Sequence, residues 1–197
     1  MPRRRKYEMR RRLEAIGETR DRIARAAFEL HGTVGPARAT ISAIAERAGV
    51  QRHTVYHHFP DMVDLIRACT EHGLRTARPP DPADLLAVED PEARLMLGLG
   101  QVYAYFRANE RLLANIFRDM PIMPELVEGS SAFAERFGEL HRALVEPVVA
   151  AGAPPALAAA AVGHALDFST WRSLTGKGLT DEQARQAMVA FVRTASG

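Results

Sequence analysis

The sequence predicts an all-α protein of about nine helices, with a small trihelical front end followed by a larger helical body. Apolar residues recur at spacings of three and four along most of the chain, which is the period of a helix with one buried face. No stretch shows the alternating β-branched residues, bounded by turn pairs, that indicate a strand. Glycine and proline interrupt the helical pattern and so mark its boundaries.

The composition is that of an ordinary globular protein. The chain has 197 residues, 47% apolar and 25% charged, so it can bury a core without a disulfide or a metal ion. Its single cysteine, Cys69, excludes a disulfide within the chain and fits a reducing compartment. No apolar run approaches the ~18 residues of a membrane span, and no apolar segment of a secretory signal follows the basic N-terminus. We therefore expect a cytoplasmic protein without a membrane partner.

The first third of the chain predicts three short helices. The first covers about 19–31 and ends at Gly32. The second follows Thr40, a good N-cap residue, and ends at Gly49. The third ends before Pro60, because proline cannot continue a helix. Their apolar residues fall on one face each: Ile23, Ala27 and Leu30, then Ile41, Ile44, Ala45 and Ala48, then Val55 and Phe59.

Longer helices are expected in the body of the chain. Asp61 can cap the fourth helix, in which Cys69 is an inert apolar filler. Residues 78–91 are rich in proline and acid and indicate a connection with room for one helical turn. Five further helices are expected over 91–108, about 112–117, 133–144, 155–175 and from Thr180 or Asp181 onward.

Charge is distributed unevenly along the chain. Residues 1–62 hold 13 basic and 7 acidic side chains, whereas residues 63–197 hold 13 basic and 17 acidic ones. Seven of the basic residues lie within 1–12, beside one acidic residue. A positive front on a mildly acidic body indicates that one end meets a polyanion. The alternative is a solvated tail.

Residues 40–59, TISAIAERAGVQRHTVYHHF, have the form of a helix-turn-helix. The glycine between the two helices can adopt the left-handed conformation that a sharp turn requires. The outer face of the second helix carries no carboxylate; its residues are Arg52, His53, Tyr56 and His57. Donors, a ring and a cation on an exposed helix suit the width and negative potential of the DNA major groove. The alternative is a helical corner whose polar face meets only solvent.

This segment resembles the DNA-binding end of the tetracycline-repressor-like (TetR) family of transcription regulators. The resemblance covers residues 19–65, and its most specific part is AERAGV followed by TVYHHF. It implies a helix-turn-helix domain over 18–62 and a helical effector-binding and dimerisation domain over 63–197. The charges of the N-terminus indicate a basic arm over 1–17. The resemblance also implies base contacts from Ser42, Arg52, His53 and His57, and phosphate contacts from Thr40, Thr54, Tyr56 and His58.

Three positions depart from the pattern of that family. Met62 stands where a phosphate-binding lysine is frequent, which weakens one expected contact. Gln51 stands where a Ser or Thr cap is usual, and it is a poorer cap. His53 replaces a small residue and adds a side chain whose charge can respond to pH.

The basic arm, with Arg3, Arg4, Arg5, Lys6, Arg10, Arg11 and Arg12, has two interpretations. It can follow phosphates or enter the neighbouring minor groove, or it is a solvated tail that is unordered without DNA. If it binds DNA, removing residues 1–12 lowers operator affinity and flattens its salt dependence.

A single helix-turn-helix contacts only one half of an operator, so it needs a second subunit to reach high affinity. Two-fold symmetry would place two recognition helices ~34–36 Å apart on a palindromic double-stranded operator. A face of small residues in the helix over 155–175 lets another helix approach closely and suits a homodimer interface. Packing within one subunit is the alternative for this face, which comprises Ala156, Ala159, Ala160 and Gly163.

The aromatic and methionine residues of the body form either core or the wall of a pocket for an unknown small-molecule effector. Polar groups beside the apolar stripes could orient that ligand. His164 lies on a stripe, so it is expected either to be hydrogen-bonded in the core or to line a cavity. The candidate pocket residues are Tyr103, Phe106, Arg107, Phe117, Met120, Phe137, His141, His164, Asp167 and Trp171.

Enzyme and metal functions find little support in the sequence. His53 and His57 have the spacing of a zinc pair, but Thr54 stands where a zincin has its Glu, and no third ligand is near. We expect no enzyme, metal or cofactor. The sequence predicts a homodimeric repressor that an effector releases from its operator. The alternative is a helical ligand-binding or interaction module that does not read DNA.

Overall fold

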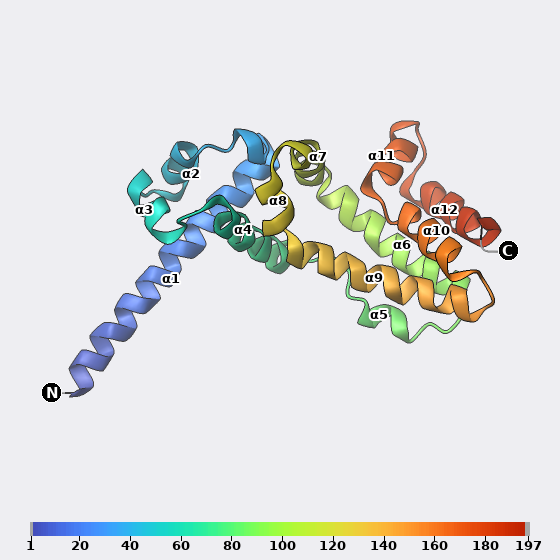
Figure 1. Ribbon diagram of the computed structural model, residues 1–197, viewed down its shortest axis with the longest axis horizontal. Coiled ribbons are helices and arrows are strands. Elements are labelled where there is room, and N and C mark those ends of the chain that lie inside the picture. Colours follow the sequence, from blue (N-terminus) through green and yellow to red (C-terminus); the bar gives the residue numbers. More distant parts are fainter. Residues whose placement is uncertain (1, 196–197) are drawn as a thin grey trace. The chain divides into compact units, whose positions relative to one another are not determined.

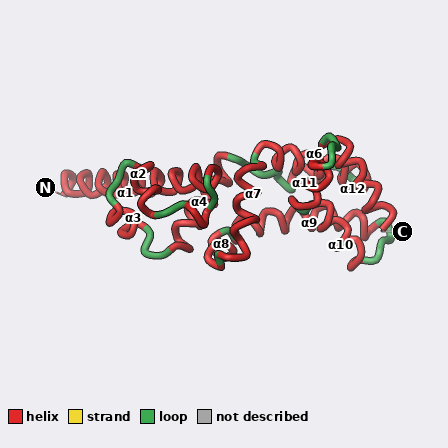
Figure 2. Tube along the Cα trace, turned by 90° about the horizontal axis from the view of Figure 1, so that it is seen from above, coloured by secondary structure: helices red, strands yellow, loops and turns green. Residues whose placement is uncertain are grey.

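The computed structural model describes the backbone of residues 2–195 and, except at 2–6, 10 and 12, their side chains. Within this part of the chain every regular element is a helix, as predicted (Figures 1 and 2). The described residues form twelve α-helices and two short 3-10 helices, η1 and η2, rather than about nine helices. Within the same residues, no helix combines the length and apolarity needed to cross a bilayer.

The chain folds into two compact units. The first consists of the residues up to Thr76 together with Arg111–Ala132, and the second of Ala77–Glu110 together with the residues from Phe133 onward. Each unit therefore joins segments that are far apart in the sequence. The trihelical front end takes two helices, α7 and α8, from the middle of the chain.

The first unit has its core where helices α1 to α4 meet. The apolar faces predicted for the first three helices lie in it: Ile23, Ile44 and Val55 are each at most 1% exposed. Burial of these faces drives the packing, since each large apolar side chain stabilises the fold by roughly 1.5–3 kcal/mol. The elements are α1 (Pro2–Thr33), η1 (Pro36–Arg38), α2 (Ile41–Ala48), α3 (Arg52–His58), α4 (Met62–Thr76), α7 (Glu110–Asp119), η2 (Met120–Ile122) and α8 (Pro124–Gly129).

The expected start of the first helix near residue 19 is wrong, because α1 already begins at Pro2. Thr19 does not cap it; its hydroxyl donates to the carbonyl of Ala15 at 2.9 Å, as in a helix interior. The preceding segment is rich in Arg and Glu, which favour helix. The backbone of the basic arm is thus helical, and the side chains at 3–6, 10 and 12 lie outside those described.

The second unit surrounds an aromatic core. Trp171, Tyr103 and Phe106 are each at most 2% exposed. Helices α6 and α9 approach closely at Gly98, where a Cβ atom would lie 2.7 Å from a methyl carbon of Leu144. The elements are α5 (Ala83–Leu86), the single turn in the 78–91 connection, α6 (Pro91–Ala108), α9 (Ser131–Ala150), α10 (Pro155–Ala165), α11 (Phe168–Gly176) and α12 (Asp181–Ala195).

The single helix expected over 155–175 is wrong, because two helices, α10 and α11, occupy this stretch. The break lies at Asp167, whose carboxylate accepts hydrogen bonds from the backbone N–H groups of Ser169 at 2.7 Å and Thr170 at 3.1 Å. Asp167 is therefore the N-cap of α11. A short carboxylate stabilises a helix start better than a helix interior, so it ends one helix and opens the next.

A buried arginine compensates for a proline inside α9. Pro147 lacks the N–H that would donate to the carbonyl of Ala143. Arg94 of α6, 8% exposed, supplies that donor from Nη1 at 3.2 Å, and its Nε donates to the carbonyl of Val88 at 2.6 Å. The guanidinium thus joins α6 to α9 and to the connection before α6.

Candidate nucleic-acid interface

The turn between α2 and α3 has the geometry that its sequence requires. The hydroxyl oxygen of Thr40 accepts a hydrogen bond from the N–H of Ala43 at 3.2 Å and caps α2. Gly49 ends α2 with φ 65° and ψ 39°, the left-handed conformation that glycine adopts without steric cost. Gln51 begins α3 without a side-chain capping bond, as its poor capping propensity predicts.

Helix α3 buries one face and exposes the other. Val55 and Phe59 are 0% and 3% exposed and pack in the core of the first unit. Tyr56 on the opposite face is 50% exposed. The other candidate DNA contacts are exposed at Thr40, Ser42, Arg52, His53 and His57, and half-buried at Thr54 and His58.

The outward side chains have few partners within the chain. Thr54 Oγ1 lies 3.5 Å from His53 Nε2, and the rings of His57 and His58 meet edge to face at 5.6 Å. Arg52 and Tyr56 form no side-chain hydrogen bond or ion pair with another described residue. Their donors are therefore available to a ligand outside the chain.

Arg20 of α1, which no sequence motif singles out, anchors the end of α3. Its Nη1 donates to the carbonyl of His58 at 2.5 Å, and its guanidinium lies 4.1 Å from the centre of the Phe59 ring. A cation at this helix end also complements the helix dipole. Burial, with the positive charges of His57 and Arg20, lowers the pKa of His58.

Helix α7 holds the segment between α1 and α2. Asn115 donates from Nδ2 to the carbonyl of His31 at 2.9 Å. Asp119, 3% exposed, accepts a hydrogen bond from the N–H of Ala37 at 3.0 Å. The hydrogen bond from Arg118 lowers the pKa of the Asp119 carboxyl, so it stays ionised. A helix distant in sequence thereby fixes the approach to α2.

The buried thiol of Cys69 has no chemical role that its surroundings support. Its Sγ lies 3.3 Å from Nδ1 of His31, and burial raises its pKa to about 12. A thiol of that pKa is protonated at neutral pH and is a poor nucleophile. Among the described residues, no three His, Cys, Asp or Glu side chains gather as a metal site requires.

The second unit brings four of the candidate pocket residues together. The Phe106 ring lies 5.9 Å from Phe137, 5.7 Å from Trp171 and 6.3 Å from Tyr103, between ring centres. The Tyr103 hydroxyl donates to the carbonyl of Ala165 at 2.9 Å. These residues form a packed aromatic core, in which the tyrosine hydroxyl already has a hydrogen-bond partner.

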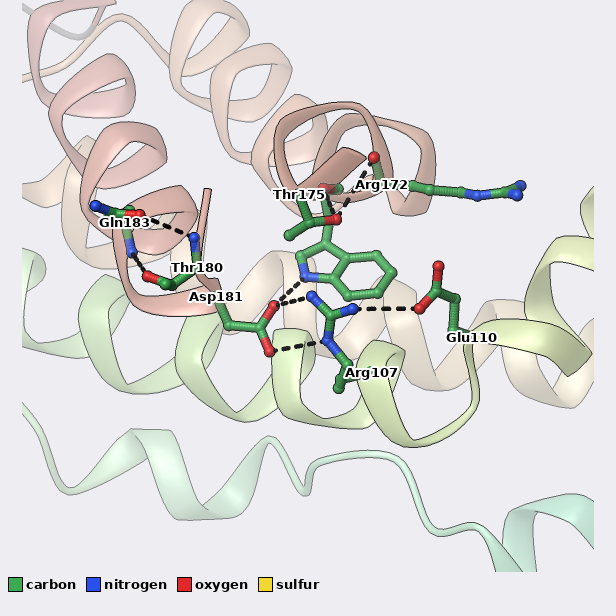
Figure 3. Close-up of polar contacts among 8 residues, drawn as sticks. Arg107, Glu110, Arg172, Thr175, Thr180, Asp181 and Gln183 are labelled. Atoms are coloured by element: carbon green, nitrogen blue, oxygen red, sulfur yellow. Dashed lines mark hydrogen bonds and ion pairs between the residues drawn. The ribbon is translucent and has the colours of Figure 1, made fainter. Parts of the chain in front are cut away.

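Arg107 lies beside this core and is also satisfied (Figure 3). Its Nη2 donates to Asp181 at 2.8 Å, and its Nη1 lies 3.3 Å from Glu110. Trp171 donates from Nε1 to the same Asp181 carboxylate at 3.0 Å, and the guanidinium lies 4.7 Å from the Trp171 ring. The hydrogen bond from Arg107 lowers the pKa of Asp181. This cluster ties α6 to α11 and α12.

The remaining candidate pocket residues lie elsewhere. His141 Nε2 is 2.8 Å from the carbonyl of Ala159. His164 is exposed rather than buried in the core, with Nδ1 3.3 Å from Thr170 Oγ1. Asp167 is the exposed cap of α11. Phe117, 42% exposed, and Met120 belong to the first unit.

The family assignment follows from the front end. Residues 23–69, from α1 through α3 and into α4, match the family described as bacterial regulatory proteins, tetR family. The front end of the chain is therefore a TetR-family domain. That family consists of DNA-binding regulators rather than enzymes. No curated protein matches the chain in sequence.

Solved structures share this fold over nearly the whole chain. A Rhodococcus sp. protein assigned to the TetR family is 18% identical with a TM-score of 0.63, covering 92% of this chain and 100% of its own. A protein from Saccharomonospora viridis assigned as a transcriptional regulator, in complex with choline, is 18% identical with a TM-score of 0.61 and coverages of 90% and 96%. The regulator FadR from Bacillus subtilis, in complex with stearoyl-CoA, is 15% identical with a TM-score of 0.57 and coverages of 89% and 97%.

Proposed function

We propose that this TetR-family regulator is a homodimeric, cytoplasmic repressor that reads a palindromic operator through α3 and leaves it when a small molecule binds. The observation that carries the proposal is the outer face of α3, which is exposed, free of carboxylates and supplied with unused donors. Such a face complements phosphates and base edges in the major groove. The proposed contacts are Thr40, Ser42, Arg52, His53, Thr54, Tyr56, His57 and His58.

The proposed division of labour follows the chain. Residues 18–62 read DNA, residues 1–17 add phosphate contacts as a basic arm, and residues 63–197 bind the effector and pair two subunits. The seven basic residues within 1–12 support the role of the arm.

Homodimerisation is supported by apolar residues on the outer faces of α10 and α12. Leu157 is 46% exposed and Phe191 is 41% exposed. His164 lies beside Phe191, with ring centres 5.6 Å apart, so these side chains border one another on adjacent helices. The small residues Ala156 and Ala160 of α10 are exposed as well. Exposed apolar side chains on two helices that pack together suit a second copy of the chain.

Release by an effector is supported by the ligands of proteins with the same fold. The Saccharomonospora viridis structure holds choline, and the FadR structure holds stearoyl-CoA. We propose that a small molecule binds beside the aromatic core of the second unit, which comprises Tyr103, Phe106, Phe137 and Trp171. It would favour the conformation whose two recognition helices are wrongly spaced for DNA, and release follows by population shift.

The test is operator selection from random duplexes, followed by binding measured by fluorescence anisotropy. Arg52→Ala should weaken operator binding about 10- to 100-fold, because a bidentate arginine–guanine contact contributes ~1–3 kcal/mol of discrimination. Arg172→Ala, which removes the same charge from the exposed face of α11, should leave binding unchanged. Two chains should bind each duplex. Equal affinities for selected and unrelated duplexes would overturn the proposal.

A further inference from the structure

Helix α6 carries two polar side chains beside the aromatic core that the chain itself does not satisfy. The Oε1 atom of Gln101 is buried and accepts no hydrogen bond from the described residues. Tyr105 follows four residues later, and its hydroxyl makes no hydrogen bond within the same part of the chain. Burial raises the pKa of Tyr105 to about 12. Residues four apart share one face of a helix, so both groups lie on the same side of α6.

An unsatisfied buried acceptor is costly, and folded proteins contain few of them. Two other polar groups of α6 show the usual behaviour: Tyr103 donates to a backbone carbonyl, and Arg107 pairs with Asp181. Among the described residues, the other buried side-chain atom without a hydrogen-bond partner is Nε of Arg185 in α12. Leucine or methionine at position 101 would avoid the cost altogether. A buried amide oxygen at this position therefore indicates a hydrogen-bond partner from outside the chain.

The surroundings of Tyr105 define the rest of the ligand. Its ring centre lies 6.3 Å from Phe133 and 6.2 Å from Phe137, and the latter two are 4.6 Å apart. All three rings are half-buried. They extend the aromatic core through Phe106, which stacks on Phe137 at 5.9 Å. This wall favours an aromatic or apolar body.

Charges at either end of this wall are already paired. Arg107, two residues after Tyr105 in α6, is bound to Asp181 and Glu110. Arg136, beside Phe137 in α9, lies 3.4 Å from Glu139 and 3.6 Å from Asp81. Neither guanidinium is left to attract an anionic ligand, so the site favours an uncharged one.

We propose that Gln101 and Tyr105 recognise the polar end of the effector, a small neutral aromatic molecule with one hydrogen-bond donor. Because Oε1 of Gln101 is covered in the unliganded chain, the amide turns outward on binding and accepts a hydrogen bond from the hydroxyl of the ligand. The ring of the ligand packs against the half-buried rings of Tyr105, Phe133 and Phe137. The term effector rests on the repressor function proposed above, whereas the binding site stands on these contacts alone.

Calorimetric titration of the full chain with phenol, toluene and benzoate tests the proposal. Phenol should bind about tenfold more tightly than toluene, which has its shape without the donor, and benzoate should not bind. Gln101→Leu should abolish the preference for phenol, and Tyr105→Phe should reduce it. Gln186→Leu, an exposed glutamine on α12, should preserve it. Equal affinities for phenol and toluene, or no binding of either, would overturn the proposal.

Thermal unfolding separates ligand recognition from a structural role. Gln101→Leu should raise the melting temperature of the unliganded protein by about 2–6 °C, because it removes a buried unsatisfied acceptor. A lower melting temperature would mean that the amide supports the fold, and it would sink the proposal. Operator binding is measured on the same preparation: loss of DNA binding alone defeats the repressor function, and loss of probe discrimination alone defeats this inference.

Discussion

The outer face of α3 and the aromatic core of the second unit treat polar side chains in opposite ways. On α3, Arg52 and Tyr56 point outward and bond to no described residue. In the core, the Tyr103 hydroxyl and the Trp171 indole each have a partner within hydrogen-bond distance. A polar group without a protein partner therefore has a different meaning in each of the two places.

Water explains the contrast. An exposed donor on α3 is hydrogen-bonded by water at no cost in free energy, so it remains available to bind DNA. A buried donor or acceptor loses its water on folding and needs a replacement partner. On the surface, charge and shape therefore identify a site, whereas in the interior a buried atom without a partner, such as Oε1 of Gln101, does so.

The largest effect that tests this contrast is expected at His31, a buried group that should govern stability and not DNA binding. Burial lowers its pKa from 6.5 to about 4. The unfolded chain takes up this proton below pH 6.5 and the folded chain only near pH 4, so stability is lost as pH falls between these values. The loss is about 2–3 kcal/mol at pH 4.5.

Urea unfolding at pH 7 and pH 4.5 measures this loss, and His31→Gln should flatten the difference. His53→Gln, on the exposed face of α3, is the matched control and should retain the full difference. If the His31→Gln variant kept the full difference in unfolding free energy between pH 7 and pH 4.5, the expectation would be contradicted.

A smaller effect should follow from the buried pair of Arg94 and Pro147. Arg94→Met leaves the carbonyl of Ala143 without a donor and should cost about 2 kcal/mol of unfolding free energy. In a Pro147→Ala background the new N–H can donate to Ala143, so the cost should fall to about 1 kcal/mol. A double-mutant cycle in urea measures the coupling, and strictly additive changes would refute it.

The smallest effects come from two matched tyrosines, one in each region. Tyr56→Phe on α3 should change stability by less than about 0.5 kcal/mol and weaken operator binding roughly 3- to 10-fold. Tyr103→Phe should do the reverse, costing about 1 kcal/mol of stability with operator affinity unchanged. If both substitutions altered the same quantity, the contrast between the two regions would fail.

Local chemistry made the front end predictable. The cap at Thr40, the left-handed Gly49 and the period of the apolar residues act over a few residues, so the helix-turn-helix could be located from the sequence. Two boundaries failed for a related reason. Thr19 and Asp167 both have capping side chains, but only Asp167 is used as a cap, and the choice depends on the neighbouring turns.

The candidate effector site was less predictable, because pairing across the chain decides it. Arg107 and Asp181 are 74 residues apart, and nothing in the sequence shows that each satisfies the other. Gln101 and Tyr105 lie off the buried stripe of α6, so the apolar periodicity of the sequence does not point to them. These two side chains matter because they have no hydrogen-bond partner within the described chain. The sequence alone does not show which side chains lack a partner.

The length of α1 limits where the basic arm can reach. An unstructured arm could search phosphates in many directions, but a continuous helix from Pro2 to Thr33 is a rod about 48 Å long. Its first half spans about 25 Å, equal to roughly seven base pairs at 3.4 Å per step. A protein that keeps this helix on DNA would leave a footprint with a sharp outer edge, whose position moves inward turn by turn as the N-terminus is shortened.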